Sequence, residues 1–272
     1  MKKFIAYFDI LGYGDRIKNK SIDEEYEIQK EIIEDIVKII ENNATKRTDF
    51  CTMHFSDTHI FYTKDVSEDA FEIIIKSSLI FMLLAAVRKH PYLPLRGVIN
   101  YGDFMGDYDR SIFIGEGLRE AYALEKRQEW MGCFLSDSCY EQAKNFEIFK
   151  EFAKKLVLVK YSVPFKDRAH SWVNWIKEVI LRQPQKLRER KDKYVINMES
   201  FPRVWGDECK NMPLTDPKFI ENIFVNRGID DSDLLKLNKS AEEKLKNTQQ
   251  FFNYIKRHTV FTELQKGKTT TS

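Results

Sequence analysis

The sequence lacks the features that mark several common classes of protein. Its four cysteines include no CxxC pair, and none stands at a metal-type spacing from a histidine. Neither a disulfide framework nor a zinc site is therefore expected. Walker A, GxSxG and HExxH motifs are also absent, which removes the usual sequence evidence for a P-loop nucleotide hydrolase, a serine hydrolase or a zinc protease.

The chain also has no strong charge bias and no long apolar run. Its 44 basic and 42 acidic residues give a formal charge of +2 over 272 residues, so no bulk attraction to nucleic acid or membrane is expected. The most apolar stretch, residues 77–87, is too short to span a bilayer. The N-terminal apolar run is too short for a signal peptide. We therefore expect a cytoplasmic protein that binds neither nucleic acid nor membrane.

What the sequence does contain is an ordered succession of strand-like and helix-like segments. Strands are predicted over 3–9, 50–56, 58–64, 93–102, 132–137 and 155–165. Helices are predicted over 21–43 and 67–90, and residues 111–130 predict a strand end that runs into a helix. The order strand, helix, strand, strand, helix, strand is the split βαβ, or ferredoxin-like, succession of an α+β fold. We expect an antiparallel sheet packed on two helices.

The pattern divides the chain into a first domain and an extension. Residues 1–165 are expected to form the catalytic domain, and residues 166–264 a mixed or helical C-terminal elaboration. Within the elaboration, residues 232–258 have the period of a long amphipathic helix. Its expected apolar face consists of Leu234, Leu237, Leu245, Phe252 and Ile255. The polar residues 265–272 are expected to be disordered.

Two aspartates fall at points that such a sheet would bring together. Asp9 closes the first predicted strand, and Asp57 lies at the reversal between the next two. Paired carboxylates suit Mg²⁺ or Mn²⁺, and the glycines of the segment 11–14 would let the backbone approach a phosphate. Either acid alone is more simply a solvent-facing residue, but together with the glycine turn they predict a metal site. His59, which follows this hairpin turn, is expected to be exposed and not catalytic.

Four segments resemble those of a known family. FDILGYG, HFSDTHIFY, LRGVINYG and FIGEGLREAYALEKR occur in the same order and at similar intervals as in the class III nucleotidyl cyclases, and the resemblance spans residues 3–165. Within that family the chain most resembles the pyrimidine cyclases of the Pycsar anti-phage system. The resemblance implies a lyase that converts a nucleoside triphosphate, UTP ahead of CTP, to a 3′,5′-cyclic monophosphate (cUMP or cCMP) and pyrophosphate. It also implies an antiviral second messenger and a separate cyclic-nucleotide receptor.

The resemblance further implies roles for individual residues. Two Mn²⁺ or Mg²⁺ ions would be held by Asp9, Asp57 and the backbone carbonyl of Ile10. The substrate triphosphate would lie over Leu11, Gly12, Tyr13 and Gly14. Lys160 loosely matches a late-strand lysine that contacts the triphosphate, and the active sites would form between the protomers of a homodimer.

The sequence departs from the purine cyclases where those enzymes read the base. Residues 51–55 contain no lysine, and residues 111–114 contain no acid. The polar residues left as candidate base readers are Cys51, Thr52, His54 and Arg96. The asparagine and arginine of the family's next helix align with Arg119 and Ala123. Arg119 is thus the candidate charge clamp for the pentavalent phosphate, or else a surface partner of Glu116 or Glu120.

Two other functions stay open. A palm-type nucleotidyltransferase would make a linked or cyclic oligonucleotide instead of a cyclic monophosphate. A catalytically inactive, nucleotide-sensing dimerisation module would bind nucleotide without releasing pyrophosphate, and its function would be indifferent to Asp57→Ala.

Overall fold

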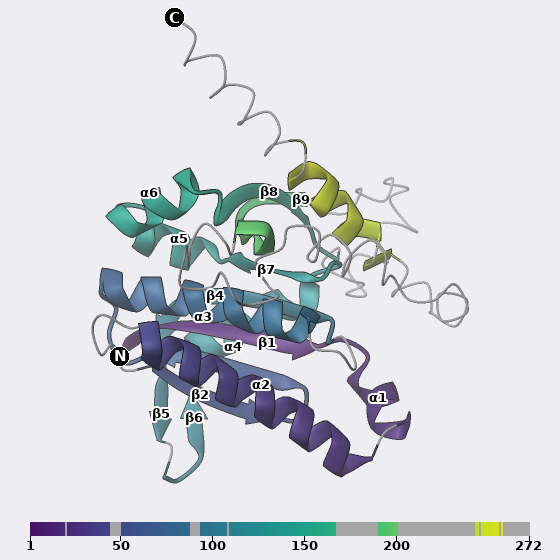
Figure 1. The fold of residues 1–272 in the computed structure, drawn as a ribbon. Coiled ribbons are helices and arrows are strands. Elements are labelled where there is room, and N and C mark those ends of the chain that lie inside the picture. The colour runs from purple at the N-terminus through teal and green to yellow at the C-terminus, as the bar shows by residue number, and fades with distance from the viewer. Residues whose placement is uncertain are drawn as a thin grey trace, which may run out of the picture.

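The computed structural model describes residues 1–19, 21–43, 50–87, 93–107, 109–166, 190–200, 243–244, 246–255 and 257. The first elements follow the predicted order: β1 (Lys2–Ile10), α2 (Ile22–Asn43), β2 (Phe50–Phe55), β3 (Thr58–Thr63), α3 (Glu68–Val87) and β4 (Leu95–Asp103). The predicted α+β, split βαβ fold is confirmed (Figure 1).

One sheet of seven strands runs through the described part of the chain, in the order β2-β3-β1-β4-β7-β9-β8. It is mixed, and the expectation of an antiparallel sheet was wrong, because β4 pairs in parallel with β7 (Gly132–Leu135). Helix α4 (Glu116–Arg127) lies between these two strands in sequence and supplies the crossover that a parallel pair needs. β9 (Arg190–Ile196) was not predicted. It lies between β7 and β8 (Leu158–Pro164), so residues beyond 165 contribute to the same sheet.

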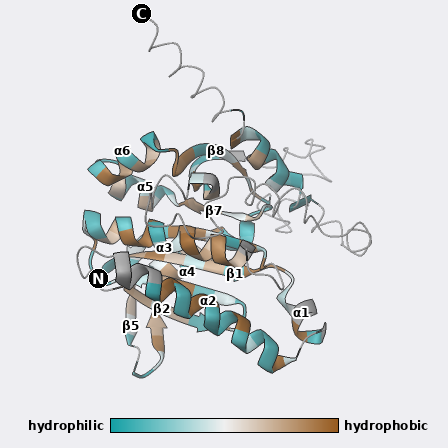
Figure 2. Cartoon of the chain, viewed as in Figure 1, coloured by the Kyte–Doolittle hydropathy of each residue, from teal (hydrophilic) through white to brown (hydrophobic). Residues whose placement is uncertain are grey.

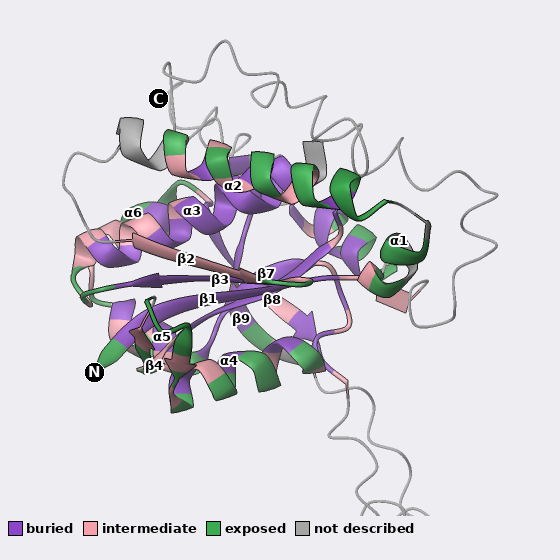
Figure 3. Ribbon diagram, turned by 90° about the horizontal axis from the view of Figure 1, so that it is seen from below, coloured by how far each residue is buried: buried purple, intermediate pink, exposed green. Residues whose placement is uncertain are grey.

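Helices cover both faces of the sheet. Figure 3 shows α2 and α3 on one face and α4 on the other. The short helices α5 (Asp137–Ala143) and α6 (Glu147–Lys154) contribute buried side chains to the cluster on the α3 face. Strand β6 (Ile112–Ile114) is the predicted strand end before α4, and it pairs with the unpredicted strand β5 (Met105–Asp107) as a separate hairpin that projects from the molecule (Figure 1).

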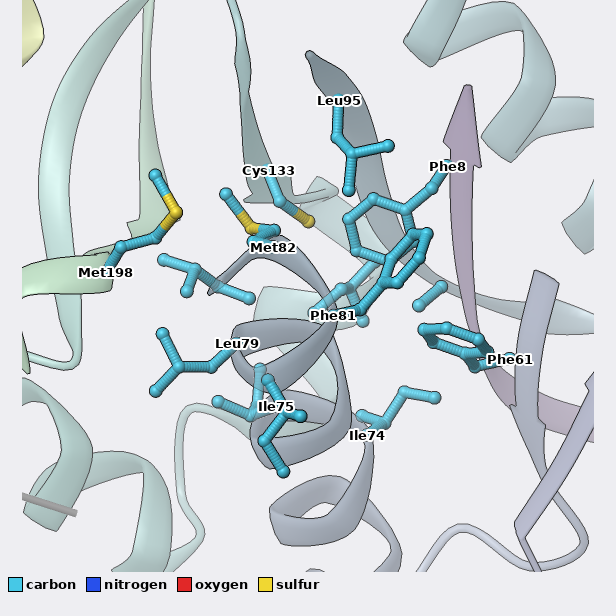
Figure 4. Close-up of a cluster of buried hydrophobic side chains, with 14 of the residues drawn as sticks. Phe8, Phe61, Ile74, Ile75, Leu79, Phe81, Met82, Leu95, Cys133 and Met198 are labelled. Atoms are coloured by element: carbon cyan, nitrogen blue, oxygen red, sulfur yellow. The ribbon is translucent and has the colours of Figure 1, made fainter. Parts of the chain in front are cut away.

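Strand β1 is buried on both faces, and its side chains alternate between two cores. Phe8 belongs to the α3-side cluster, and Tyr7 belongs to the α4-side cluster. On the α3 side, the Phe81 ring lies 5.1 Å from Phe8 and 5.2 Å from Phe61, both edge-on (Figure 4). Helix α3 is mostly apolar, whereas α2 has polar residues along its length (Figure 2). The tightly packed α3 face leaves the opposite face, beneath α4, as the place where charged groups of the sheet gather.

The C-terminal region is described in part. Residues 243–257 are helical apart from the undescribed residues 245 and 256, and Phe252 and Ile255 are buried as predicted. Leu234, Leu237, Leu245 and the tail 265–272 lie outside the described residues. None of the helices in the described ranges has the length and apolar character needed to cross a membrane.

Candidate functional site

The two predicted aspartates lie at one end of the sheet. Asp9 stands near the C-terminal end of β1, opposite Thr58 of β3 and Arg96 of β4. Asp57 lies in the tight turn between β2 and β3. The backbone N–H of Ile10 donates to the carbonyl oxygen of Asp57 at 2.9 Å. This bond fixes the hairpin turn beside the end of β1.

Asp9 is a buried carboxylate with charged neighbours of both signs. It is only 6% exposed, and its Oδ2 lies 3.1 Å from Nη2 of Arg96. Burial raises the pKa of Asp9, Arg96 and Lys126 oppose that rise, and the nearby Asp57 adds to it. A divalent cation next to the Asp9 carboxylate would stabilise its charged form.

Arg96 was predicted to read the base, but the structure places it elsewhere. It is 4% exposed, and its Nη2 also pairs with the fully buried Glu125 of α4. Its Nη1 donates to the carbonyl oxygen of Gln128 at 3.4 Å. Because the guanidinium is occupied by Asp9, Glu125 and backbone, Arg96 orients the Asp9 carboxylate and is not open to a base.

Glu125 was missed by the sequence interpretation, although a signal was present. Gly117, Ala121 and Glu125 follow at intervals of four and form the buried face of α4. A charged residue on such a face indicates a buried partner, here Arg96. Burial raises the pKa of Glu125 to about 7, with Arg96 opposing the rise and Asp9 adding to it.

The glycine turn lies directly behind Asp9. Residues 11–12 form the turn, and α1 (Tyr13–Asn19) begins at Tyr13. Gly12 has φ +75, a conformation that favours glycine. A Cβ at either Gly12 or Gly14 would meet no atom within 4 Å. The backbone of this turn is therefore accessible to a ligand, as a phosphate cradle requires.

Of the candidate base readers on β2, His54 is one of the residues that line the cavity described below, and its ring packs against His59. Side chains alternate along β2, and Cys51 and Met53 pack on the α4-side cluster that faces Asp9, so Thr52 and His54 point to the α2 and α3 face. His54 Nδ1 lies 2.7 Å from Nδ1 of His59. His59 is 1% exposed, which corrects the expectation of an exposed residue. Burial lowers the pKa of His54 to about 4 and that of His59 well below its usual value, so both rings are neutral.

Lys160 is also remote from the carboxylates. It lies on the edge strand β8, four strands from β1, which is roughly 19 Å at the usual spacing between strands. Its exposed ammonium lies 3.9 Å from Asp192. Lys160 is therefore far from Asp9 of its own protomer, and its contact with the triphosphate in a homodimer stays a prediction.

A cavity of about 800 Å³ opens on the α4 face next to this end of the sheet. Its walls come from β1, β2, β3, β6 and α4, and the residues are Tyr7, Met53, His54, Phe55, Thr58, Ile60, Ser111, Phe113, Ile114, Gly115, Leu118, Arg119 and Tyr122. The Tyr7 hydroxyl lies 3.3 Å from Oγ1 of Thr58, and burial raises the pKa of Tyr7 to about 12. Arg119 is exposed, and its Nε donates to Glu116 at 2.8 Å, the surface pairing that the sequence left open.

Comparison with known proteins identifies the fold. No protein-family model and no curated protein matches the sequence. The crystal structure of the catalytic core of a rhodopsin-guanylyl cyclase with converted specificity, in complex with ATPαS, matches with a TM-score of 0.50 at 12% identity, over 72% of this chain and 94% of that one. This chain has a nucleotidyl cyclase fold. The guanylate cyclase domain of RhGC from Catenaria anguillulae, in complex with GTP, matches with a TM-score of 0.47 (11% identity, 72% and 96% coverage). The adenylyl cyclase CyaB from P. aeruginosa matches with a TM-score of 0.43 at 13% identity, over 72% of this chain and 94% of that one.

The oxygen atoms available in this cyclase fold suit Mg²⁺ or Mn²⁺. Nowhere in the described ranges do three His, Cys, Asp or Glu side chains gather as a metal cluster. The candidate ligands are the carboxylates of Asp9 and Asp57 and the carbonyl oxygen of Ile10. Mg²⁺ commonly binds through one or two carboxylates together with substrate phosphates, so this donor set fits a cation that arrives with a nucleotide.

Proposed function

We propose that this protein is a nucleotide cyclase that converts a nucleoside triphosphate to a 3′,5′-cyclic monophosphate and pyrophosphate. The observation that supports this most is the convergence of Asp9 and Asp57 beside an accessible glycine turn, within a cyclase fold. In the reaction the substrate's 3′-hydroxyl gives its proton to water, and the 3′-oxygen attacks the α-phosphorus in line. The bond from the α-phosphorus to the bridging oxygen breaks, and its electrons leave with pyrophosphate.

The chain's own groups have distinct parts in this proposal. Asp9, Asp57 and the Ile10 carbonyl would hold two Mg²⁺ or Mn²⁺ ions, which supply Lewis-acid activation of the 3′-oxygen and charge neutralisation at the triphosphate. Arg96 fixes the Asp9 carboxylate so that one face remains directed at the ligand. The turn at residues 11–14 offers backbone to the phosphates.

Arg119 is proposed as the charge clamp on the reacting phosphate. It lines the cavity beside Thr58 and Tyr122, and its present partner Glu116 is an exposed residue one helical turn earlier. Such surface pairs contribute about 0–1 kcal/mol. Arg119 can therefore exchange Glu116 for a phosphate at little cost.

We propose that the substrate carries a pyrimidine base, with UTP preferred to CTP. Among the described residues that line the cavity there is no lysine and no carboxylate, and the polar side chains include the hydroxyls of Tyr7, Thr58 and Ser111. This composition lacks the charged pair with which purine cyclases would read their base, and hydroxyls can both donate to and accept from a pyrimidine edge. With this specificity we propose an antiviral signalling role, in which a separate receptor binds the cyclic nucleotide.

A homodimer is proposed as the active form. Large apolar side chains are exposed around the cavity mouth, among them Phe55, Met105, Ile112, Ile114 and Tyr122. They come from the tip of β2, the β5–β6 hairpin and α4. A second copy seated on this surface would bury them and close the cavity.

The proposal is tested by incubating the purified full chain with ATP, GTP, CTP or UTP and Mn²⁺, and identifying products by mass spectrometry. Asp57→Ala removes a proposed metal ligand, and Asp103→Asn, an exposed acid at the far end of β4, is the matched control. We expect a cyclic monophosphate from one pyrimidine triphosphate with wild type and the control, and none with Asp57→Ala. A linked oligonucleotide would favour a nucleotidyltransferase, and binding without pyrophosphate release would favour an inactive sensor.

A further inference from the structure

The helix at residues 243–257 docks on the segment that supports Arg96. Nδ2 of Asn247 donates to the carbonyl oxygen of Glu129 at 2.7 Å, and the Met131 N–H donates to Oγ1 of Thr248 at 2.9 Å. The Phe251 ring stands edge-on to Trp130, 5.0 Å away. Just before this contact, the Gln128 carbonyl accepts from Arg96. A helix outside the predicted catalytic domain thus lies immediately behind the Asp9–Arg96 pair.

Lys244 is one helical turn before Thr248, whose hydroxyl donates to the Lys244 carbonyl oxygen at 2.7 Å. The side chain is half-buried. Burial lowers the pKa of Lys244, repulsion from Arg96 and Lys166 lowers it further, and Glu129 and Asp9 oppose the change. Thr248 contacts Met131, and the next residue, Gly132, lies opposite Arg96 in the sheet, so the turn of helix that carries Lys244 lies on the Arg96 side of the site.

No carboxylate in the described ranges forms an ion pair with the Lys244 ammonium. Holding a half-buried cation next to Arg96 without an ion-pair partner reduces the stability of the fold. An anion bound between Lys244 and the end of β1 would offset that cost. Lys126 also acts electrostatically on Asp9 and Glu125, so it adds a further basic group near this point.

We propose that Lys244 is a substrate-binding residue that contacts the polyphosphate of the nucleoside triphosphate and the pyrophosphate that leaves. This inference rests on the proposed function and gives the C-terminal helix a cation beside Asp9 of its own protomer. When the bond to the α-phosphorus breaks, negative charge grows on the departing pyrophosphate. The Lys244 ammonium would stabilise this charge while keeping its proton.

The kinetic test compares Lys244→Met and Lys244→Arg with Lys246→Met, which removes an exposed lysine from the same helix. With the accepted triphosphate, Lys244→Met should raise KM by about tenfold, the size of one charge-assisted contact. It should weaken inhibition by added pyrophosphate by a similar factor. Lys244→Arg should restore most of the wild-type KM and most of the inhibition by pyrophosphate. Lys246→Met should match wild type in both measurements. Equal KM and equal pyrophosphate inhibition in Lys244→Met and wild type would overturn the inference.

A binding test separates this inference from the cyclase activity. Inorganic tripolyphosphate with Mg²⁺ is titrated calorimetrically into the full-length wild type and into Lys244→Met. Weaker binding by Lys244→Met supports the Lys244 contact even if no triphosphate is turned over, in which case the proposed cyclase activity alone fails. Equal binding overturns the contact even if the wild type is an active cyclase. Because the substitution removes a repelled charge, the melting temperature of Lys244→Met should equal or exceed that of wild type, which excludes unfolding as the cause of lost binding.

Discussion

At the scale of single residues, the account depends on how Arg96 is shared between two buried carboxylates. Asp9 lies near the end of β1, and Glu125 is on the fully buried face of α4; both carboxylates pair with Arg96. Removing one partner of a buried ion pair commonly leaves an uncompensated charge. Here Arg96 keeps Asp9 when Glu125 is neutral, so protonation of Glu125 leaves a balanced pair.

Glu125 makes the stability of the fold depend on pH, and the direction of this dependence is opposite to that of an ordinary salt-bridged acid. Its folded-state pKa is raised from 4.5 to about 7, so between these values the unfolded chain loses this proton while the folded chain keeps it. Stability must then fall as pH rises through this window, by up to about 3 kcal/mol. We expect the Glu125→Gln variant to show a flatter decline. The measurement is thermal unfolding of chelator-treated protein from pH 4.5 to 8.

The control for that experiment is Glu151→Gln, which neutralises an exposed acid on α6 and should keep the wild-type profile. A wild-type melting temperature that rises across the same window would contradict the buried state of Glu125. So would a decline that Glu125→Gln leaves unchanged.

How well the site could be predicted depended on what each residue type reveals. Asp9 and Asp57 could be placed together because strand ends and hairpin turns can be predicted from the sequence. The face of β2 on which Thr52 and His54 lie could not be predicted, because it follows from register, and a shift of one residue reverses every side chain. Arg96 and Glu125 are far apart in sequence, and only the docking of α4 on β4 makes them partners.

At the scale of elements, the position of α4 is set by glycines. A Cβ on Gly117 would lie 2.9 Å from the carbonyl carbon of Gly102 and 2.9 Å from Cδ1 of Ile5. These distances are too short for real contacts, so α4 can approach β4 only because both positions lack a side chain. The close approach brings Glu125 to Arg96 and Arg119 to the cavity.

Gly117→Ala should therefore push α4 away from the sheet. We expect a loss of about 1–3 kcal/mol in the free energy of unfolding, the usual cost of overpacking, measured by urea denaturation. Gly14→Ala is the comparison, because a Cβ there meets nothing within 4 Å. It should cost nothing or add up to about 1 kcal/mol through helix propensity. Equal stability of Gly117→Ala and wild type would contradict the close contact between α4 and β4.

Elements with a clear hydrophobic period were predicted well, and the others were not. The helices at 22–43 and 68–87 and the strands of the split βαβ unit have such periods. Strand β9 has the sequence RKDKYVI. Its first four residues are charged, so the sequence shows no apolar alternation there, and the strand was not predicted. Strand β5 has three residues, too few to establish an alternation, whereas β6 was predicted as the strand end before α4.

At the scale of the whole molecule, the account requires a second copy. Phe55 is 78% exposed and Ile114 is 58% exposed, both on the cavity rim. We expect Phe55→Asp combined with Ile114→Asp to convert a dimer to a monomer in sedimentation experiments and to abolish activity. Ile22→Asp, on the distant α2 and 75% exposed, should remain a dimer with wild-type activity. A fully active monomer would contradict the proposal that the site is completed by a partner.

The most direct test of the central claim is the four-nucleotide assay with Mn²⁺, read by mass spectrometry, on wild type and Asp57→Ala. The account predicts a cyclic pyrimidine monophosphate and one equivalent of pyrophosphate from the wild type, and neither from the variant. The absence of product from all four triphosphates, by a folded wild-type dimer that binds nucleotide, would contradict it. So would turnover that is unchanged when Asp57 is removed.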